Sequence, residues 1–220
     1  YGDTSDPADR RWEEVPWAFF PAMPDRDDPA QVAAYHANSL NQFGAWKFED
    51  VCLKFRPTIV LSYRDTWMDE WIGRSPFRRF FRWVWMPTVD AVPQDPAWVA
   101  AYAGADALLT YTDWAADVLR GYGLSVRGAA SPGAALDVLR PVPDRPAHQK
   151  ALGLPGSPLV VGTVMRNQMR KLYPDLLKGF RIYLESAPPY LACRTYLYLH
   201  VCYPDIGLDL PALLKEHGLC

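Results

Sequence analysis

Four polar side chains follow one short apolar run in the second half of the sequence. The run PLVVGTVM (158–165) is followed within six residues by Arg166, Asn167, Arg170 and Lys171. Arginine and lysine donate several N–H groups to phosphate oxygens, and asparagine can donate from its side-chain amide. This spacing predicts a turn that binds an anion, in particular a diphosphate.

The helix predicted after this turn bears on the same interpretation. Residues 172–185 place their apolar side chains on one face, so a helix should begin close to Lys171. Cations oppose the positive end of a helix dipole by ~0.3–1 kcal/mol each, whereas an anion bound among them would reverse that balance. The alternative is a basic turn whose side chains are simply solvated, and the pattern alone does not separate the two.

Further polar residues follow predicted strands in the first half of the sequence. Arg64 and Asp65 come directly after TIVLSY (58–63), and Asp90 follows WVWMPTV (83–89). Ligands bind at the carboxyl ends of strands in open α/β sheets, so these three residues are candidates for contact with a hydroxyl-bearing acceptor. Helix capping or a salt bridge in a loop is the competing explanation for each of them.

These residues need strands and helices to position them, and the hydrophobic pattern predicts both in alternation. Helical spacing over residues 29–55 is interrupted near Gly44, which predicts two consecutive helices. Strands are then expected at 58–63, 83–89, 107–112 and 126–131, and helices at roughly 75–83, 95–103 and 113–121. Such alternation predicts a doubly wound α/β domain with a parallel sheet.

A Pro-rich, polar segment separates this pattern from a second one. We expect a linker at 141–158 between a first Rossmann-like domain, residues 1–140, and a second one that starts at residue 159. Strands are predicted at 158–165 and 194–201, and helices at 172–185 and 210–217. Two strands are few for a sheet, so residues 159–220 are expected to be part of a domain. The chain is expected to be cut at both ends, with the start of the first domain missing.

Composition argues against several classes of protein. The 220 residues carry a net charge of -2 and 50% of them are hydrophobic, which allows a buried core and disfavours nucleic acid as a partner. The four cysteines and four histidines show no metal-ligand spacing, so we expect no metal and reduced thiols. The sequence contains no apolar run of membrane-spanning length and no signal-peptide pattern, so a cytoplasmic location is expected.

The segment SPFRRFFRWVW (75–85) has two interpretations. As a helix it would gather Arg74, Arg78, Arg79 and Arg82 on one side, as in helices that lie on a membrane surface. Most amphipathic helices of this length cover a sheet instead. We therefore expect a sheet-covering helix, with contact to a membrane surface as the alternative.

The ordered motifs resemble a known group of enzymes. GTVMRNQMRKLYPDLLKGF and YLYLHVCYPDIGLDLPALLKEHGL are similar to the opening of the donor-side domain in retaining GT-B glycosyltransferases related to glycosyltransferase family 4. FRPTIVLSYRD, TVDAVPQDPAW, GADALLTYTDWAADVL and SPGAALDVLRP fit the acceptor-side domain of the same group, in the same order. The resemblance covers the chain from about residue 30 to its end.

The resemblance implies a GT-B fold and sugar transfer from a nucleotide diphospho-sugar to an unidentified acceptor, with no cofactor required. In this family an Arg and a Lys contact the donor diphosphate as the sugar leaves, and Arg166 and Lys171 match those positions. Asn167 joins them in the donor-binding turn. Gly133 of the SPG motif would let the backbone approach the donor.

On the acceptor side, the positions of Arg64, Asp65 and Asp90 at predicted strand ends make them the candidates, with Asp90 as a further catalytic candidate. Two features depart from the family. The family's Asp directly after the SPG turn is replaced by the longer SPGAALD, and the Glu-x7-Glu motif that holds the donor ribose and sugar does not occur in these 220 residues. The chain alone is therefore expected to be inactive.

Two alternatives remain open at this point. One is a non-catalytic module that uses the basic turn to bind phosphate or a phosphoprotein. The other is a GT-B sugar-nucleotide epimerase, which would share the anion site but should place catalytic carboxylates and histidines in the cleft between the domains. Few histidines lie near the predicted strand ends, which counts against an epimerase.

Overall fold

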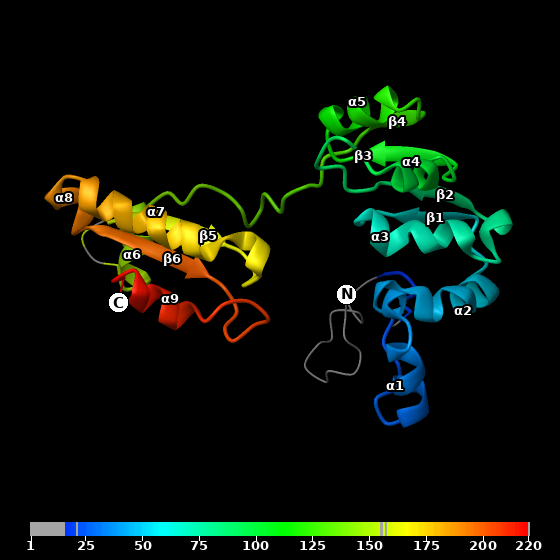
Figure 1. Cartoon of the computed structure of the whole chain (residues 1–220), viewed down its shortest axis with the longest axis horizontal. Helices are drawn as coiled ribbons and strands as arrows, with labels where there is room; N and C mark the ends of the chain where they lie inside the picture. Colours follow the sequence, from blue (N-terminus) through cyan, green and yellow to red (C-terminus); the bar gives the residue numbers. More distant parts are fainter. Residues whose placement is uncertain (1–15, 21, 155, 157, 220) are drawn as a thin grey trace. The chain divides into compact units, whose positions relative to one another are not determined.

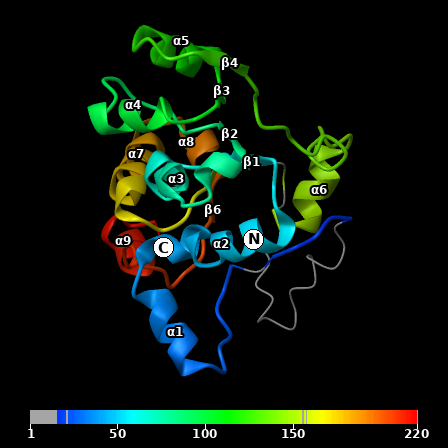
Figure 2. The ribbon, with the colours of Figure 1, turned by 90° about the vertical axis from the view of Figure 1, so that its right-hand side faces the viewer.

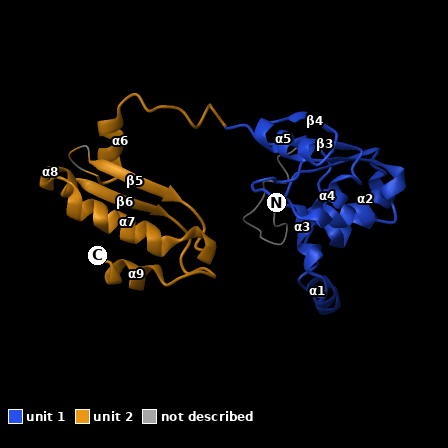
Figure 3. Ribbon diagram, turned by 45° about the horizontal axis from the view of Figure 1, so that its top comes forward, with its two compact units in different colours: residues 1–134 blue, residues 135–220 orange. Residues whose placement is uncertain are grey.

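The computed structural model describes residues 16–20, 22–154, 156 and 158–219. The chain divides into two compact units, unit 1 with residues 1–134 and unit 2 with residues 135–220 (Figure 1, Figure 3). Each unit contains its own parallel sheet. The candidate acceptor residues therefore belong to unit 1, and the candidate diphosphate-binding turn belongs to unit 2.

Unit 1 is built on a four-stranded parallel sheet in the order β1-β2-β3-β4 (Figure 1, Figure 2). Its strands are β1 (Ile59–Ser62), β2 (Arg82–Trp85), β3 (Ala107–Thr110) and β4 (Val126–Ala129). Ser62 pairs with Trp85, and Trp85 pairs with Leu108. Because the strands are parallel, the residues that follow them emerge at one edge of the sheet.

Several helices of unit 1 begin after a residue whose side chain caps them. α1 (Pro29–His36) follows Asp28, whose Oδ1 accepts hydrogen bonds from two backbone N–H groups, and α5 (Asp113–Gly121) follows Thr112, whose Oγ1 accepts one. The other helical segments are η2 (Ser39–Phe43), α2 (Ala45–Phe55), α3 (Thr66–Asp69), η3 (Glu70–Arg74), η4 (Arg78–Phe80) and α4 (Pro96–Tyr102). Gly44 separates η2 from α2 with a φ of 98°, so the predicted break is confirmed.

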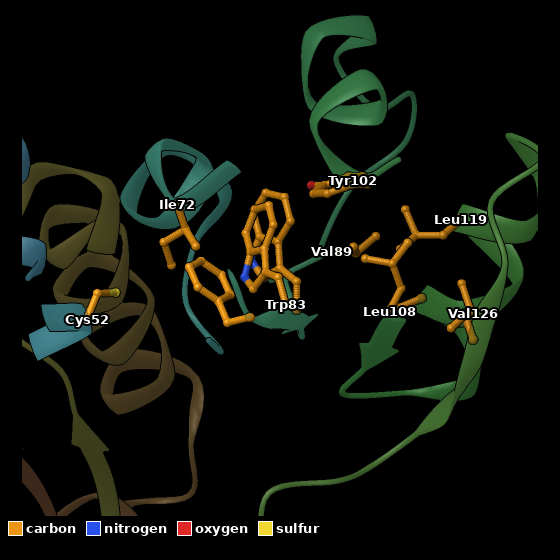
Figure 4. Close-up of a cluster of buried hydrophobic side chains, with 12 residues drawn as sticks. Cys52, Ile72, Trp83, Val89, Tyr102, Leu108, Leu119 and Val126 are labelled. Atoms are coloured by element: carbon orange, nitrogen blue, oxygen red, sulfur yellow. The ribbon is translucent and has the colours of Figure 1, made fainter. Parts of the chain in front are cut away.

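Two tryptophans of β2 form the centre of the unit 1 core. Trp83 and Trp85 are buried, and their rings stack with centroids 4.4 Å apart. Figure 4 shows Trp83 between Ile72 and Tyr102, and the indole Nε1 of Trp83 donates to Ser62 Oγ at 3.0 Å. This packing fixes β2 against β1, and thereby fixes the edge from which the candidate acceptor residues emerge.

The segment 75–83 is not the amphipathic helix that the sequence predicts. Only the short turn η4 is helical, and β2 already begins at Arg82. Asp106 supplies the physical reason, because its carboxylate accepts from Arg78 Nη2 at 2.7 Å, Arg82 Nη1 at 3.0 Å and the backbone N–H of Trp83 at 2.8 Å. Two arginines expected on the polar face of a helix thus tie the start of β2 to the start of β3.

Unit 2 contains a two-stranded parallel sheet of β5 (Leu159–Val164) and β6 (Thr195–His200), with Val164 paired to His200. Its helical segments are α6 (Arg145–Ala151), η5 (Met169–Lys171), α7 (Tyr173–Ser186), α8 (Pro189–Ala192) and α9 (Leu210–Glu216). α7 buries Tyr173, Leu177 and Phe180 on one side, which is the apolar face predicted from its spacing. Helix α6 lies inside the segment 141–158.

None of the helices in the described part of the chain is long and apolar enough to cross a membrane.

Candidate functional site

The carboxyl ends of β5 and β6 open into a hollow of about 630 Å³ in unit 2. Val164 and His200 end the two strands in register, so the segments that follow them lie side by side. The hollow is lined by residues from both segments: Val164, Met165, Arg166, Leu199, His200, Val201, Cys202 and Asp205. The carboxyl edge of a parallel sheet is where ligands bind in open α/β folds.

Arg166 meets a carboxylate across this edge. Its Nε and one Nη each donate to a different oxygen of Asp205, both at 2.9 Å, which is the two-point geometry that suits a guanidinium and a carboxylate. The Arg166 side chain is 58% exposed, whereas that of Asp205 is only 8% exposed. Hydrogen bonding to Arg166 lowers the pKa of Asp205, and the same pair raises the pKa of Arg166. Both groups are therefore ionised at neutral pH.

Asn167 fixes the segment that carries Asp205. Its side-chain amide donates to the carbonyl of Leu208 at 2.7 Å and accepts from the N–H of Leu208 at 3.0 Å, and Asn167 is fully buried. Gly207 passes so close that a Cβ added there would lie 2.3 Å from Asn167 Oδ1. The structure therefore gives Asn167 a supporting contact within the turn, where the sequence predicts contact with the donor.

Lys171, the second cation predicted to contact the diphosphate, lies in the 3-10 helix η5 that follows Arg166. Lys171 ends η5 and is half-buried, and within the described residues its ammonium group makes no ion pair. Leu172 follows at a φ of 53°, and α7 then begins without a side-chain cap, so the first N–H groups of this 14-residue helix have no side-chain partner there. Arg170 is exposed. An anion near this turn would meet unneutralised positive charge from Lys171 and from the helix end.

The candidate acceptor residues follow β1 and β2 in unit 1. Arg64 donates through Nη2 to Asp69, a fully buried carboxylate at the end of α3. Burial raises the pKa of Asp69, and the Arg64 guanidinium opposes that rise. Arg64 thus forms a salt bridge with a buried partner. A salt bridge is the explanation that the sequence analysis gives as the alternative to a functional role.

Asp65 and Asp90 each influence the pKa of a tyrosine hydroxyl in unit 1. The hydroxyl of Tyr111 donates to the carbonyl of Tyr63 at 2.9 Å, and its pKa is raised mainly by burial, with further contributions from Tyr63 and from the carboxylates of Asp65 and Asp69. The pKa of Tyr102 is raised by burial and, to a lesser extent, by Asp90. Asp65 precedes α3 without capping it through its side chain, and Asp90 is exposed. Asp90 is therefore accessible at this edge, whereas Asp65 is half-buried.

An apolar hollow of about 550 Å³ lies beside the carboxyl end of β1 in the same unit. It is lined mostly by aromatic and aliphatic side chains, with Gln42, Ser62 and Arg64 as its polar members. Its other lining residues are Phe19, Phe20, Ala22, Met23, Phe43, Gly44, Phe48, Val60, Leu61, Tyr63, Trp71 and Ile72. Arg64 therefore contacts the buried Asp69 carboxylate and also lines this hollow.

Gly133 lies in an exposed segment, and a Cβ added there would meet no atom within 4 Å. Its φ is not in the left-handed region, so the backbone does not require glycine at this position. Its predicted role near a donor stays a prediction.

Two carboxylates of these edges are missing from the sequence-based candidates. Asp205 follows β6, and Asp69 lies four residues after Asp65. The position of Asp205 after a predicted strand is a signal that could have identified it, because the same rule selects Asp65 and Asp90. Asp69 has no comparable signal, since burial of a carboxylate is set by the tertiary fold.

Within the described residues, no group of three or more His, Cys, Asp or Glu side chains is arranged to hold a metal ion. Cys52 is buried, and Cys193 and Cys202 are exposed; all three are free thiols.

No family model matches the chain. No curated protein matches it either. Among solved structures, it is similar to a protein from Listeria monocytogenes described as a UDP-N-acetylglucosamine 2-epimerase, with a TM-score of 0.51 and 16% sequence identity. The similarity covers 84% of this chain and 48% of that one, so the chain spans about half the length of that structure. The chain thus has a GT-B-like, Rossmann-like α/β fold with parallel sheets, as the sequence predicts.

Proposed function

We propose that the chain is part of a glycosyltransferase that uses a nucleotide diphospho-sugar. In this proposal unit 2 binds the donor diphosphate and unit 1 binds the acceptor. The observation that carries this proposal is the position of Arg166 at the carboxyl ends of β5 and β6, where it lines a hollow of about 630 Å³. Lys171 and the start of α7 come later in the same turn, outside the lining of the hollow. We infer that together they supply the N–H donors and positive charge that bind a diphosphate.

The chemistry assigned to these cations is electrostatic. In glycosyl transfer, the bond between the anomeric carbon and the diphosphate oxygen breaks, and the electron pair leaves with the nucleoside diphosphate. Arg166 and Lys171 stabilise the negative charge that grows on the departing oxygens, a type of stabilisation that often supplies the largest part of a rate enhancement. The family resemblance implies that the configuration of the sugar is retained.

The acceptor contributes an oxygen to the anomeric carbon and loses a proton. Asp90 is the carboxylate proposed to take that proton, because it is exposed at the carboxyl edge of the unit 1 sheet. Asp65 and Arg64 orient the acceptor hydroxyl. The apolar hollow beside β1 would accommodate a non-polar part of the acceptor.

Calorimetric titration tests the donor half of this proposal. UDP, GDP and inorganic pyrophosphate are titrated into the chain and into a variant that carries both Arg166→Ala and Lys171→Ala. Arg181→Ala is the matched control, because Arg181 is another arginine of unit 2 that pairs with a carboxylate, Glu185 at 2.7 Å. We expect one nucleoside diphosphate to bind the chain and the control, and the double variant to lose at least tenfold in affinity.

Pyrophosphate separates this function from simple phosphate binding. A glycosyltransferase should prefer one nucleoside diphosphate over pyrophosphate, because base and ribose contribute to affinity. Equal affinity for pyrophosphate, UDP and GDP would instead identify a phosphate-binding module without a nucleotide. Failure of all three to bind would contradict the donor site.

An epimerase acting on a sugar nucleotide is the second candidate. Two observations favour it: the structural similarity to a protein described as an epimerase, and the presence of His200 and Asp205 among the residues that line the unit 2 hollow. Incubation with UDP-N-acetylglucosamine, once without and once with an added acceptor, followed by NMR, distinguishes the two. An epimeric sugar that is still attached to its diphosphate indicates an epimerase, whereas transfer to an added acceptor with release of UDP indicates a glycosyltransferase.

A further inference from the structure

Asp205 contacts the guanidinium that is proposed to bind the donor, yet it carries the same charge as the ligand. A guanidinium has five N–H donors in one plane. Asp205 accepts from Nε and Nη2 of Arg166, each at 2.9 Å, which leaves the other N–H groups for a ligand in the hollow that both residues line. We propose that Asp205 is a positioning residue, which holds the Arg166 guanidinium in the orientation that receives a phosphate group. This inference rests on the proposed function.

The Asp205 carboxylate is itself held in place by its own segment. Its Oδ1 accepts from the backbone N–H of Ile206 at 2.8 Å, and its side chain is only 8% exposed. The buried amide of Asn167 binds both backbone groups of Leu208, three residues further on. A fixed carboxylate can orient a flexible, exposed arginine, because the arginine loses side-chain freedom before a ligand arrives.

Charge and orientation predict opposite results when Asp205 is replaced. If its carboxylate only neutralised Arg166, its removal would strengthen anion binding, since one negative charge beside the site would disappear. If the carboxylate orients Arg166, its removal weakens binding despite the favourable change in charge. The sign of the change in affinity therefore separates positioning from simple neutralisation.

The test is calorimetric titration of UDP and inorganic pyrophosphate at pH 7.5 and constant ionic strength into the full chain, Asp205→Ala and Asp205→Asn. Glu185→Gln is the matched control, because it also removes one negative charge from an Arg–carboxylate pair of unit 2, at the far end of α7. We expect Asp205→Ala to weaken binding about tenfold. Asp205→Asn should weaken it by a smaller factor, because its amide oxygen still accepts one hydrogen bond from Arg166. Glu185→Gln should change the affinity less than twofold.

A second readout reports the orientation of Arg166 directly. The NMR signal of the Arg166 Nε–H should be protected from solvent exchange in the unaltered chain, weakly protected in Asp205→Asn and unprotected in Asp205→Ala. Equal or tighter binding by both variants would overturn the positioning role and leave the donor site intact. Absence of binding by the unaltered chain would instead contradict the proposed function. If Asp205→Ala fails to fold, Asp205→Asn and the Arg166 signal decide the outcome.

Discussion

The Arg166 guanidinium presents several N–H donors in one plane, and a positive charge without that geometry cannot make the same two-point contacts. An Arg166→Lys variant keeps the positive charge but can make only a point contact with Asp205 and with a phosphate. We expect its affinity for UDP to fall about tenfold, close to that of Arg166→Ala. Calorimetry under the conditions used for the unaltered chain measures this change. Undiminished affinity in Arg166→Lys would show that charge alone, without that geometry, binds the ligand.

Asn167 connects the two segments that follow the strands of unit 2. An Asn167→Ala variant leaves the partly buried N–H and C=O of Leu208 without their side-chain partner. Because unsatisfied buried polar groups cost about 1–3 kcal/mol each, we expect a loss of about 2–3 kcal/mol in the free energy of unfolding of unit 2. Urea denaturation followed by circular dichroism measures it. Gln168→Ala, on the neighbouring residue, is the control and should stay within about 0.5 kcal/mol.

The basic turn could be predicted from the sequence because its signal is local. Arg166 and Lys171 lie within a few residues of a strand whose apolar run is unmistakable. The partner of Arg166 is 39 residues away in the sequence, on a segment brought alongside only when β6 pairs with β5. Local patterns do not specify such a pairing partner, so the contact between Arg166 and Asp205 could not be predicted, although Asp205 follows a predicted strand.

The junction of η4, β2 and β3 depends on a single carboxylate. Asp106 accepts from the backbone N–H of Trp83 and from Arg82 and Arg78, which together lower its pKa from 3.8 to about 2. A carboxylate whose pKa is lower in the folded state stabilises the fold above its unfolded pKa. That stability is lost as the pH falls from about 4 towards 2. After allowance for its partial exposure, the contribution is roughly 1–2 kcal/mol.

Replacement of this carboxylate tests the assignment. We expect Asp106→Asn to unfold at lower guanidinium concentration than the unaltered chain at pH 7, and the difference to shrink towards pH 2. Tryptophan fluorescence follows the transition, since Trp83 and Trp85 form the core beside Asp106. Asp117→Asn is the control, because Asp117 is exposed and pairs with Arg120, three residues away. A difference between Asp106→Asn and the unaltered chain that is independent of pH would contradict this account.

At the level of elements, strands and their flanking helices follow from the hydrophobic pattern. The strands at 107–110 and 159–164 lie inside their predicted ranges, and α5 has the predicted bounds, since Thr112 caps it and its apolar side chains face the core. The predicted helix at 75–83 is wrong because the arginines there have helical spacing but bind Asp106, which the local pattern does not include. Asp106 lies more than twenty residues later, and its three hydrogen bonds outweigh a local preference for helix.

At the scale of the whole molecule, the two units differ in their intrinsic spectroscopic probes, because they differ in tryptophan content. All nine tryptophans of the chain precede residue 135 and therefore belong to unit 1. Unit 2 contributes helices and strands but no indole ring. Tryptophan fluorescence thus reports on unit 1, whereas far-UV circular dichroism reports on both units. The chain can consequently show which unit a ligand stabilises without any added label.

This difference yields a prediction for the donor ligand. If UDP binds at Arg166 in unit 2, saturating UDP at about 100 times its Kd should stabilise that unit by about 2.7 kcal/mol. Urea unfolding should then show a larger shift in the midpoint measured by circular dichroism than in the midpoint measured by tryptophan fluorescence. The Arg166→Ala and Lys171→Ala double variant should show neither shift at the same UDP concentration. A midpoint shift that is larger in tryptophan fluorescence, or confined to it, would place the nucleotide in unit 1, because a ligand stabilises the folded region that it contacts. That result would refute the assignment of the donor site to the turn after β5.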